Sequence, residues 1–530
     1  MIKINQLKLP VGHSQKDLED KIRKTLRIPS KETFHYEVMR RSLDARKKPS
    51  LFYVYCIYVT IRQENSIVKK LHQPSVSLVT ETGYRFSEMG HERLNRRPVI
   101  VGAGPCGLFA AWQLTLAGYA PLILERGKQV EDRSADVERF WETGILQPDS
   151  NVQFGEGGAG TFSDGKLNTV VKDSSGRNRY VLETFVKFGA PSDILYDAKP
   201  HIGTDILAKV IKNMRDYLIK HDAEFRFQTC LKDIQIKENA LHALVTEDDT
   251  VIPADVAILA LGHSARDTFM MLHRHQLPME AKNFAVGFRV EHPQQMIDDA
   301  MYGKRNALRL PAAPYKVTSN FPNGRGVYSF CMCPGGYVVN ASSMKEKTCV
   351  NGMSYSGRSG KNANSAIIVS VSPADYGAQD PLDGMHFQET LEHKTYQLGN
   401  GKIPQQLFGD YRQNIASQGY GDFNSQTKGQ TCFANLRGLM TEDMEHSFLL
   451  GMEHFSNIIP QFDRSDAILS GMETRTSSPV RIMRDTNGES RVHGIYPGGE
   501  GAGYAGGIMS AAMDGLRLAD DVMKRYHPVY

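Results

Sequence analysis

The sequence predicts an α/β protein with a doubly wound parallel sheet, and three segments carry that prediction. Residues 98–127 have the pattern of a short strand, a glycine-rich turn, a helix and a second strand that ends in an acid. Residues 254–268 contain an apolar run that ends at Gly262 and leads into a helical pattern. Residues 494–523 repeat the order of strand, glycine turn and helix. Strands that alternate with helices are typical of an open parallel sheet, whose ligands bind at the carboxyl edge.

The first segment has the spacing of a dinucleotide-binding turn. Gly102, Gly104 and Gly107 form a GxGxxG pattern, which lets main chain approach a pyrophosphate and lets a helix pack on a strand. The pyrophosphate would lie on the free N–H groups of the helix that follows. Glu125 ends the next strand, where its carboxylate can accept hydrogen bonds from a ribose. Strand, turn, helix and acid in register favour a bound dinucleotide over a purely structural turn.

Length and composition indicate a globular chain of two or three domains. Its 530 residues, 41% hydrophobic and 23% charged, exceed what one core holds. A net charge of +4 gives no general argument for a nucleic acid or a membrane partner. The first ten residues lack the apolar run of a secretory signal, and we expect a cytoplasmic protein without a transmembrane helix. The seven cysteines include no CxxC pair, so free thiols and no metal site are expected.

Changes in pattern divide the chain into four segments. Residues 1–95 are predicted to form a small N-terminal α+β domain, and residues 96–280 the first part of the nucleotide-binding domain. Residues 281–468, with short strands and Gly and Pro turns, are predicted to be an inserted mixed α+β cap domain. Residues 469–530 return to the nucleotide-binding domain.

The N-terminal segment combines a helix with a basic hairpin. Ser14 is the expected N-cap of a helix that ends at residue 26, and strands are predicted at residues 34–39 and 51–61. One exposed loop between these strands is expected to carry Arg40, Arg41, Arg46, Lys47 and Lys48. Such a loop either contacts an anion or RNA or is a solvated hairpin tip, and the second interpretation is favoured.

Four further motifs match a known family. They are GEGGAGTFSDGKL (155–167), ALGHSARDTF (260–269), TRTSSPVRI (474–482) and GGEGAGYAGGI (498–508). Together with the first glycine turn they resemble the FAD-binding domain of glutathione-reductase-like flavoproteins. Specifically, they resemble the branch of uncharacterised FAD-dependent dehydrogenases related to geranylgeranyl reductase-like and BaiN-like proteins. The resemblance covers about residues 30–530 and implies a Rossmann-like domain that binds FAD rather than NAD.

The resemblance also implies roles for individual residues. The first glycine turn would hold the pyrophosphate, residues 158–166 would run beside the flavin, and Gly262 would pack near the cofactor. Glu500 would meet the ribityl or phosphate region, where many relatives carry Asp. The expected cofactor-binding residues are Gly102, Gly104, Gly107, Glu125, Arg126, Gly158, Gly160, Ser163, Lys166, Gly262, Glu500, Gly501 and Gly503.

The last glycine cluster supports a flavin by its own chemistry. A helix that begins near Gly503 and points its N-terminus at the flavin would stabilise the negative charge of the reduced ring by ~1–2 kcal/mol. Side chains at Gly501, Gly506 or Gly507 would block this approach. The alternative is that these glycines serve close helix packing.

The candidates for catalysis are Cys331, Cys333, His263 and Arg475. The two cysteines could exchange electrons with a flavin, although buried cysteines also act as small hydrophobes. His263 could donate to flavin or substrate, or cap the following helix. Arg475, together with Arg481, could bind a substrate carboxylate or stabilise reduced flavin, or could form a structural ion pair.

Three other residues have open interpretations. Arg289 and His292 begin the predicted cap and either line the cleft or lie on the surface. Cys106 lies inside the phosphate turn, where packing against the sheet is favoured over a contact with flavin.

The sequence therefore predicts an FAD-dependent oxidoreductase that passes hydride or electrons through flavin N5. Its substrate is a small molecule that the sequence does not identify. The chain has no evident separate domain for a nicotinamide cofactor, so NADH or NADPH would donate from solvent, or a protein partner would donate instead. The alternatives are an FAD-containing RNA-binding or tRNA-modifying protein that uses the basic hairpin, and a flavin-binding module without turnover. Salt-sensitive retention of RNA would favour the former.

Overall fold

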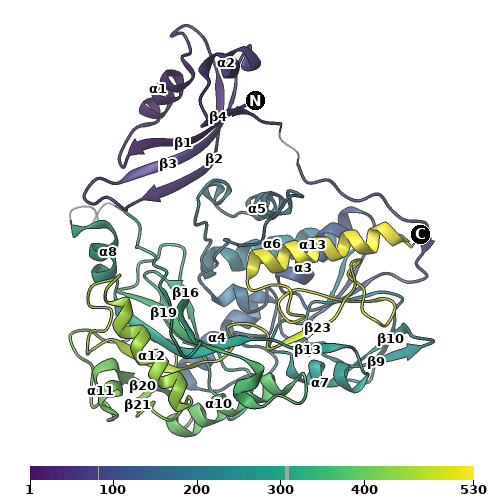
Figure 1. Ribbon diagram of the computed structural model, residues 1–530. Helices are drawn as coiled ribbons and strands as arrows, with labels where there is room; N and C mark the ends of the chain where they lie inside the picture. Colours follow the sequence, from purple (N-terminus) through teal and green to yellow (C-terminus); the bar gives the residue numbers. More distant parts are fainter. Residues whose placement is uncertain (81–82, 305–309, 530) are drawn as a thin grey trace.

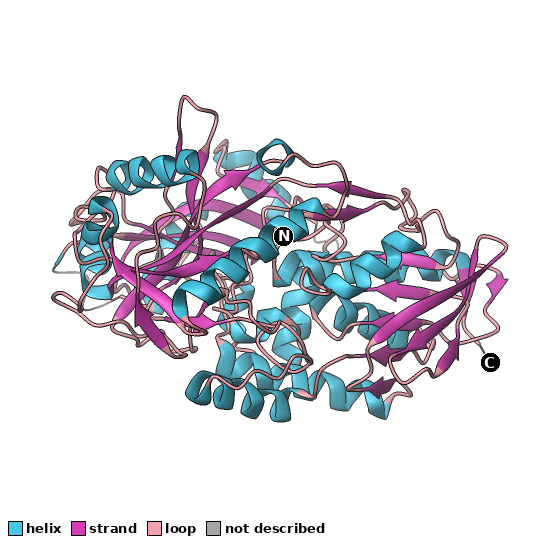
Figure 2. Ribbon diagram, turned by 90° about the horizontal axis from the view of Figure 1, so that it is seen from below, coloured by secondary structure: helices cyan, strands magenta, loops and turns pink. Residues whose placement is uncertain are grey.

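The computed structural model describes residues 1–80, 83–304 and 310–529, which form three bodies (Figure 1). A small N-terminal module stands apart from two larger ones. Seen from below, the strands gather in two groups at opposite ends of the molecule, with helices between and around them (Figure 2). In the described residues, none of the helices is long and apolar enough to cross a membrane.

The N-terminal module is an antiparallel sheet in the order β2-β3-β1-β4 with two helices on it. Its elements are β1 (Ile2–Pro10), α1 (Gln15–Leu26), β2 (His35–Asp44), β3 (Phe52–Thr60), α2 (Glu64–Leu71) and β4 (Val76–Leu78). The hydroxyl of Ser14 accepts a hydrogen bond from the Asp17 N–H, and the Asp17 carboxylate accepts one from the Ser14 N–H. This capping box confirms the predicted start of the helix.

The predicted basic loop is shorter than expected, because β2 continues to Asp44. Arg40 and Arg41 lie in the strand, and only the tip around Lys47 is an exposed loop. The Arg41 N–H donates to the Tyr196 carbonyl at 2.6 Å, and its guanidinium pairs with Asp197. The prediction of one basic loop is therefore wrong for Arg40 and Arg41, whereas Arg46, Lys47 and Lys48 do lie on the exposed tip.

The nucleotide domain is built on a parallel sheet, as predicted, in the order β24-β12-β6-β7-β8. Its strands are β6 (Val99–Val101), β7 (Leu122–Leu124), β8 (Glu224–Arg226), β12 (Ala257–Leu259) and β24 (Ile495–Pro497). Four helices cover one face: α3 (Pro105–Leu116), α5 (Arg177–Lys187), α6 (Thr204–Lys220) and α13 (Ile508–Arg525). The other face packs on α7 (Arg266–Arg274) and an antiparallel sheet of β9 (Leu231–Lys237), β10 (Ala240–Thr246) and β11 (Val251–Pro253). Because both faces are covered, the central strands are apolar throughout.

Close packing of α3 and α13 orders the nucleotide site. A Cβ at Gly515 of α13 would collide with the main chain of Cys106 in α3. The remaining described helices of this domain are α4 (Val130–Thr143) and the short helices η1 (Ala159–Phe162) and η2 (Ser192–Leu195). Two further strand pairs are β5 (Glu92–Arg93) with β25 (Tyr526–His527), and β13 (Met279–Ala281) with β23 (Val480–Ile482). The β5 strand lies beside the C-terminal end of the chain (Figure 1).

The cap is a seven-stranded sheet in the order β15-β16-β19-β14-β22-β20-β21. Its strands are β14 (Phe284–Pro293), β15 (Thr318–Asn320), β16 (Gly326–Cys333), β19 (Asn362–Val371), β20 (Ile403–Leu407), β21 (Thr431–Phe433) and β22 (Ile468–Glu473). A hairpin of β17 (Tyr337–Asn340) and β18 (Val350–Met353) and the helices α8 (Gln294–Tyr302), η3 (Pro373–Tyr376), α10 (Asp383–Gly399), α11 (Phe408–Gln413) and α12 (Glu442–Phe455) complete it. Since β22 pairs with β14 and β20, the cap ends after Glu473 and not at the predicted residue 468.

Candidate functional site

A cavity of about 330 Å³ lies where the carboxyl edge of the parallel sheet meets the cap. Residues from both domains line it, and they include most of the predicted cofactor site. The predicted residues in its lining are Gly102, Gly104, Glu125, Arg126, Gly158, Gly160, Ser163, Lys166, Gly262, His263, Cys331, Arg475 and Glu500. The structure thus brings together residues that are hundreds of positions apart in the chain.

The first glycine turn presents main chain to this cavity. Gly102 has a φ of +105°, and a Cβ there would collide with the Ala260 carbonyl of the neighbouring strand. Gly104 is the N-cap of α3, and a Cβ placed on it would lie 3.7 Å from the Gly158 Cα. The first N–H groups of a helix have no partner within the helix and favour an anion. The turn therefore has the geometry that a phosphate cradle requires.

Gly107 has a different role from the one the resemblance implies. It lies outside the described lining of the cavity, and a Cβ on it would collide with the Gly102 carbonyl. Its role is to let α3 approach the strand, which agrees with the general use of the third glycine.

Glu125 accepts hydrogen bonds from the main chain of two glycine loops, a structural role that the sequence does not indicate. One carboxylate oxygen accepts from the Ala103 N–H at 2.8 Å, and the other accepts from the N–H groups of Gly127 and Gly155 at 2.9 and 3.0 Å. The carboxylate thus ties the first glycine turn to the second glycine loop. It also lines the cavity, and an ionised carboxylate has further lone pairs with which to accept from a ribose.

The sequence gives no sign of the residue that shapes the second glycine loop. Arg133 of α4 is fully buried, and its guanidinium donates to five main-chain carbonyls, those of Asn151, Val152, Gly155, Glu156 and Gly158. Burial lowers its pKa to about 10. Only the fold brings this helix against the loop, so no local motif could have identified Arg133.

The rest of this loop leads from the nucleotide domain to the cap. The Ser163 hydroxyl donates to the Gly160 carbonyl at 2.7 Å, and Lys166 donates to the Met332 carbonyl of the cap. Arg126 lines the cavity beside it, paired with Asp267 at 2.7 Å and stacked over a phenylalanine ring.

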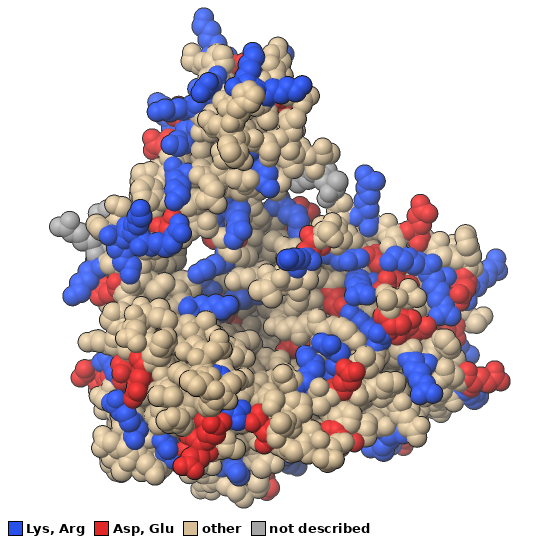
Figure 3. All heavy atoms as spheres, viewed as in Figure 1, with Lys and Arg blue, Asp and Glu red and all other residues tan. Residues whose placement is uncertain are grey.

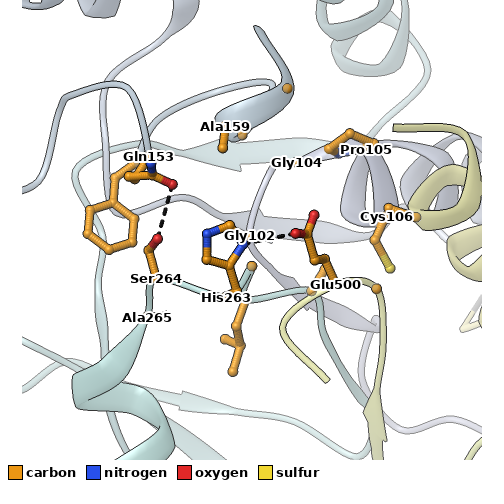
Figure 4. A pocket seen from close by; sticks show the side chains of 18 of the residues that line it. Gly102, Gly104, Pro105, Cys106, Gln153, Ala159, His263, Ser264, Ala265 and Glu500 are labelled. Atoms are coloured by element: carbon orange, nitrogen blue, oxygen red, sulfur yellow. Dashed lines mark hydrogen bonds and ion pairs between the residues drawn. The ribbon is translucent and has the colours of Figure 1, made fainter. Parts of the chain in front are cut away.

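His263 and Glu500 form a pair inside the cavity (Figure 4). His263 Nδ1 lies 3.0 Å from Glu500 Oε1, and Nε2 is buried with no hydrogen-bond partner in the described residues. Helix α7 has Ala265 at its N-cap, so the predicted capping role of His263 is wrong. Ser264 instead donates to Gln153 at 3.0 Å (Figure 4). An unsatisfied ring nitrogen that faces a cavity is suited to a ligand group.

The C-terminal helix begins later than predicted. Helix α13 starts at Ile508 with Gly507 as its N-cap, because the glycine-rich residues before it form a loop. Gly506 and Gly507 line the cavity, and an added Cβ on either would meet no described atom within 4 Å. Gly501 and Gly503, predicted to bind cofactor, lie outside the described lining. A Cβ on each would meet the carbonyls of Gly262 and Val480, so their role is packing.

Arg475 forms a structural ion pair, which is one of the interpretations that its sequence position allows. It donates to both oxygens of Glu392 at 2.8 Å, and Arg266 donates to the same two oxygens at 2.9 Å. Burial disfavours the charged form of Glu392, but the two guanidinium groups outweigh it and lower its pKa. Arg481 faces the Tyr504 ring at 5.3 Å and is not in the described lining.

Arg289 and His292 do not occupy either place expected for them. Both are fully buried in the cap core, outside the described lining of the cavity and away from the surface. His292 Nε2 lies 2.7 Å from the Phe462 carbonyl, and burial lowers its pKa to about 4. The strand β14 places both side chains inside because both faces of the cap sheet are covered.

The cysteines differ in position. Cys331 lines the cavity, whereas Cys333 is fully buried and its thiol lies 3.2 Å from the Cys331 carbonyl. Cys106 is buried at the edge of the cavity against Gly498 and Gly499, and burial raises its pKa. All seven cysteines are free thiols, as expected.

Three family models match parts of the chain. Residues 283–476 match "FAD-dependent protein, C-terminal domain-like", which covers the cap as the structure defines it. Residues 100–139 match an NAD(P)-binding Rossmann-like domain, and residues 1–60 match a domain of unknown function, DUF8436.

A relative from Clostridium beijerinckii, described as an uncharacterized protein, is 42% identical over 531 residues and covers 99% of both chains. Similar solved structures include the E. coli quinol fumarate reductase subunit FrdA (11% identity, 82% of this chain and 71% of that chain, TM-score 0.36). Another is the halogenase PltM in complex with FAD (12% identity, 81% and 70%, TM-score 0.39).

The chain belongs to the same family as the Clostridium beijerinckii protein, and its cap matches the C-terminal domain of FAD-dependent proteins. Its cofactor is FAD. The residues present fit this cofactor, since Gly104, Gly262, Gly506 and Gly507 leave open space in which main chain can contact it. The narrower resemblance to geranylgeranyl reductase-like and BaiN-like proteins stays a prediction.

Proposed function

We propose that the protein is a dehydrogenase or related oxidoreductase that passes hydride or electrons through flavin N5 to or from a small molecule. One observation carries this proposal: a single cavity has a glycine-lined nucleotide wall on one side and a wall of polar cap residues on the other. FAD supplies the redox chemistry when bound, namely a ring that accepts two electrons. The chain supplies binding, orientation and electrostatics.

The nucleotide wall gains positive electrostatic potential from helix N-termini more than from Lys and Arg side chains. Helices α3 and α13 both begin at the cavity, at Gly104 and Gly507. Their N-terminal N–H groups carry partial positive charge that favours an anion, by ~1 kcal/mol each near the helix end. In this proposal α3 faces the pyrophosphate and α13 faces the ring that gains negative charge on reduction.

The cap wall is the proposed substrate side. Phe330, Cys331, Asn351 and Glu473 come from three cap strands and face the glycine turns across the cavity. Burial raises the pKa of Glu473 to about 7, and Arg289 opposes this shift. A carboxyl that titrates near neutral pH can hold or release a proton beside a reacting group.

We infer that the electron donor comes from outside the chain. NADH and NADPH are the first candidates, and they would approach the cavity from solvent, since the described residues form one five-stranded parallel sheet and FAD takes the cavity at its carboxyl edge. The test is an anaerobic titration of purified protein with each nucleotide while flavin absorbance is followed, and then a screen of acceptors. Bleaching by a donor and recovery with an acceptor are expected. A flavin that neither nucleotide reduces, and that no acceptor reoxidises after dithionite, would support a binding module without turnover.

A further inference from the structure

A buried guanidinium organises the cap wall of the cavity. Arg289 of β14 donates to the Cys331 carbonyl at 2.8 Å, to Asn351 Oδ1 at 2.9 Å and to the carboxylate of Glu473. It donates also to Asn364 Oδ1 at 3.0 Å. Since its planar donors are all engaged and the residue is fully buried, the positions of the three wall groups are fixed relative to one another.

Cys331 has an unusual backbone conformation within this wall. Its φ is +43°, in the left-handed region that side chains other than glycine rarely adopt. The pairing of β16 with β19 shifts register between Phe330 and Cys333, which is a β-bulge. Bulges redirect a side chain and occur often beside active sites. Here Cys331 lines the cavity, while Cys333 is buried behind it.

The electrostatic surroundings of Cys331 favour a thiolate. The hydrogen bond with the Cys333 thiol lowers the pKa of Cys331 most, burial opposes it, and Lys166 and Arg289 lower it further. Burial and the same contact raise the pKa of Cys333. Lys166 is charged, because Asp164 at 3.6 Å raises its pKa against the effect of burial. The thiolate is the reactive form of cysteine.

Two further features of the cavity indicate a ligand. His263, across the cavity in the nucleotide domain, has a side chain that is 9% exposed, and its buried Nε2 has no partner among the residues that the structure describes. Lys166 and Arg358 share the single carboxylate of Asp164, so positive charge is in excess there. Lys and Arg side chains also gather around the hollow beneath the N-terminal module (Figure 3). A ligand with negative charge suits these surroundings.

We propose that Cys331 is a nucleophilic thiolate in the flavin cavity and that its substrate is a small disulfide that carries a carboxylate. Cys331 Sγ attacks one sulfur, a new S–S bond forms, the original S–S bond breaks, and the other half leaves as a thiolate. No oxidant is consumed in this step. The inference rests on the proposed function, since it names an electron acceptor for it, but thiol exchange can be measured without flavin turnover.

The experiment uses two disulfide probes on the full-length protein, as purified and after saturation with FAD. Dithiobis(nitrobenzoate) carries two carboxylates, whereas dithiodipyridine is neutral. The released chromophore gives the rate at about pH 6, where an ordinary thiol is protonated. Mass spectrometry locates the modified residue. We expect Cys331 to react at least about tenfold faster than the partly exposed Cys56, Cys230 and Cys432, whose pKa values burial raises.

Variants separate the parts of the inference. Cys331→Ser should remove the fast phase, and Cys432→Ser should not. Lys166→Gln should slow both probes, because Lys166 lowers the pKa of Cys331, and should slow the anionic probe about three- to tenfold more than the neutral one. Both probes should still reach Cys331 in the FAD-saturated protein, because Cys331 belongs to the cap wall and FAD is expected on the glycine turns.

The proposal would be overturned if mass spectrometry of the modified wild-type protein showed that Cys331 reacts no faster than the other thiols. Loss of the fast reaction in the FAD-saturated protein would also overturn it. If the protein binds no FAD and Cys331 still reacts fast, the proposed redox function fails and the thiol site stands. If flavin cycles with NADH or NADPH and Cys331 is inert, the thiol site fails alone.

Discussion

The two walls of the flavin cavity are built from different kinds of atoms. The nucleotide wall is mostly main chain: glycine turns at residues 102–104 and 506–507 and the first N–H groups of two helices. The cap wall consists of side chains, and buried charges such as Arg289 and Glu473 hold it in place. Main-chain groups therefore line the side on which FAD is expected, whereas particular side chains line the side on which the substrate is expected.

The largest effect should come from filling the nucleotide wall. In Gly104→Val, the new side chain would enter the cradle, where a Cβ is already 3.7 Å from the Gly158 Cα. We expect complete loss of FAD retention with normal folding, measured by flavin content and circular dichroism. Gly419→Val is the matched control, since this glycine is exposed and a Cβ there meets no described atom within 4 Å. A fully loaded Gly104→Val protein would show that main chain does not form this wall.

The second effect tests the side-chain wall. Arg289→Met leaves the Glu473 carboxylate buried without its charged partner, and removal of one member of a buried pair costs ~3–5 kcal/mol. We expect a correspondingly lower midpoint of urea unfolding, with FAD affinity reduced much less. Arg412→Met, at a guanidinium whose side chain is 46% exposed, serves as the control. Equal stability of the Arg289 and Arg412 variants would mean that the buried charges do not organise the cap.

The third effect concerns the pH dependence of cap stability. Burial lowers the pKa of His292 to about 4, whereas an unfolded His titrates near ~6.5. Between these values the unfolded chain binds a proton that the folded cap excludes, so stability falls as pH falls, by up to ~3 kcal/mol. His292→Gln should flatten this slope in urea unfolding. His386→Gln, at an exposed ring, should leave it as in the wild type. A slope that persists in His292→Gln would assign the acid sensitivity to other groups.

The smallest effect concerns His263, which follows β12 on the nucleotide side of the cavity. His263→Phe keeps a ring but removes the nitrogen that faces the cavity and the bond to Glu500. We expect FAD to bind about tenfold more weakly, which is ~1.4 kcal/mol, in a fluorescence titration. His493→Phe, with a side chain 60% exposed, is the control. Unchanged affinity would place the His263 nitrogen outside the cofactor contact.

The same contrast explains how much could be predicted from the sequence. The turn of Gly102 and Gly104, the Glu125 strand end and the parallel sheet follow from local spacing, and all are found. Arg133 and Arg289 were missed or misplaced, because their partners come from other strands and loops that only the fold brings near. A lone charged residue in a strand gives no sign that it will be fully buried.

The boundary errors have local causes. Arg41 was assigned to a loop because basic residues suggest solvent, yet β2 continues and pairs it with Asp197. The start of α13 was placed near Gly503, but consecutive glycines delay the helix until Ile508. A tertiary contact decides the position of Arg41, and the low helix preference of glycine decides the start of α13.

The central claim, that main chain from separate glycine turns grips one FAD, is tested most directly by the flavin content of the purified protein. The protein is denatured, and the released cofactor is identified by chromatography and counted against chain concentration. The account predicts FAD, at one molecule per chain after saturation. A colourless protein that takes up no added FAD would contradict it.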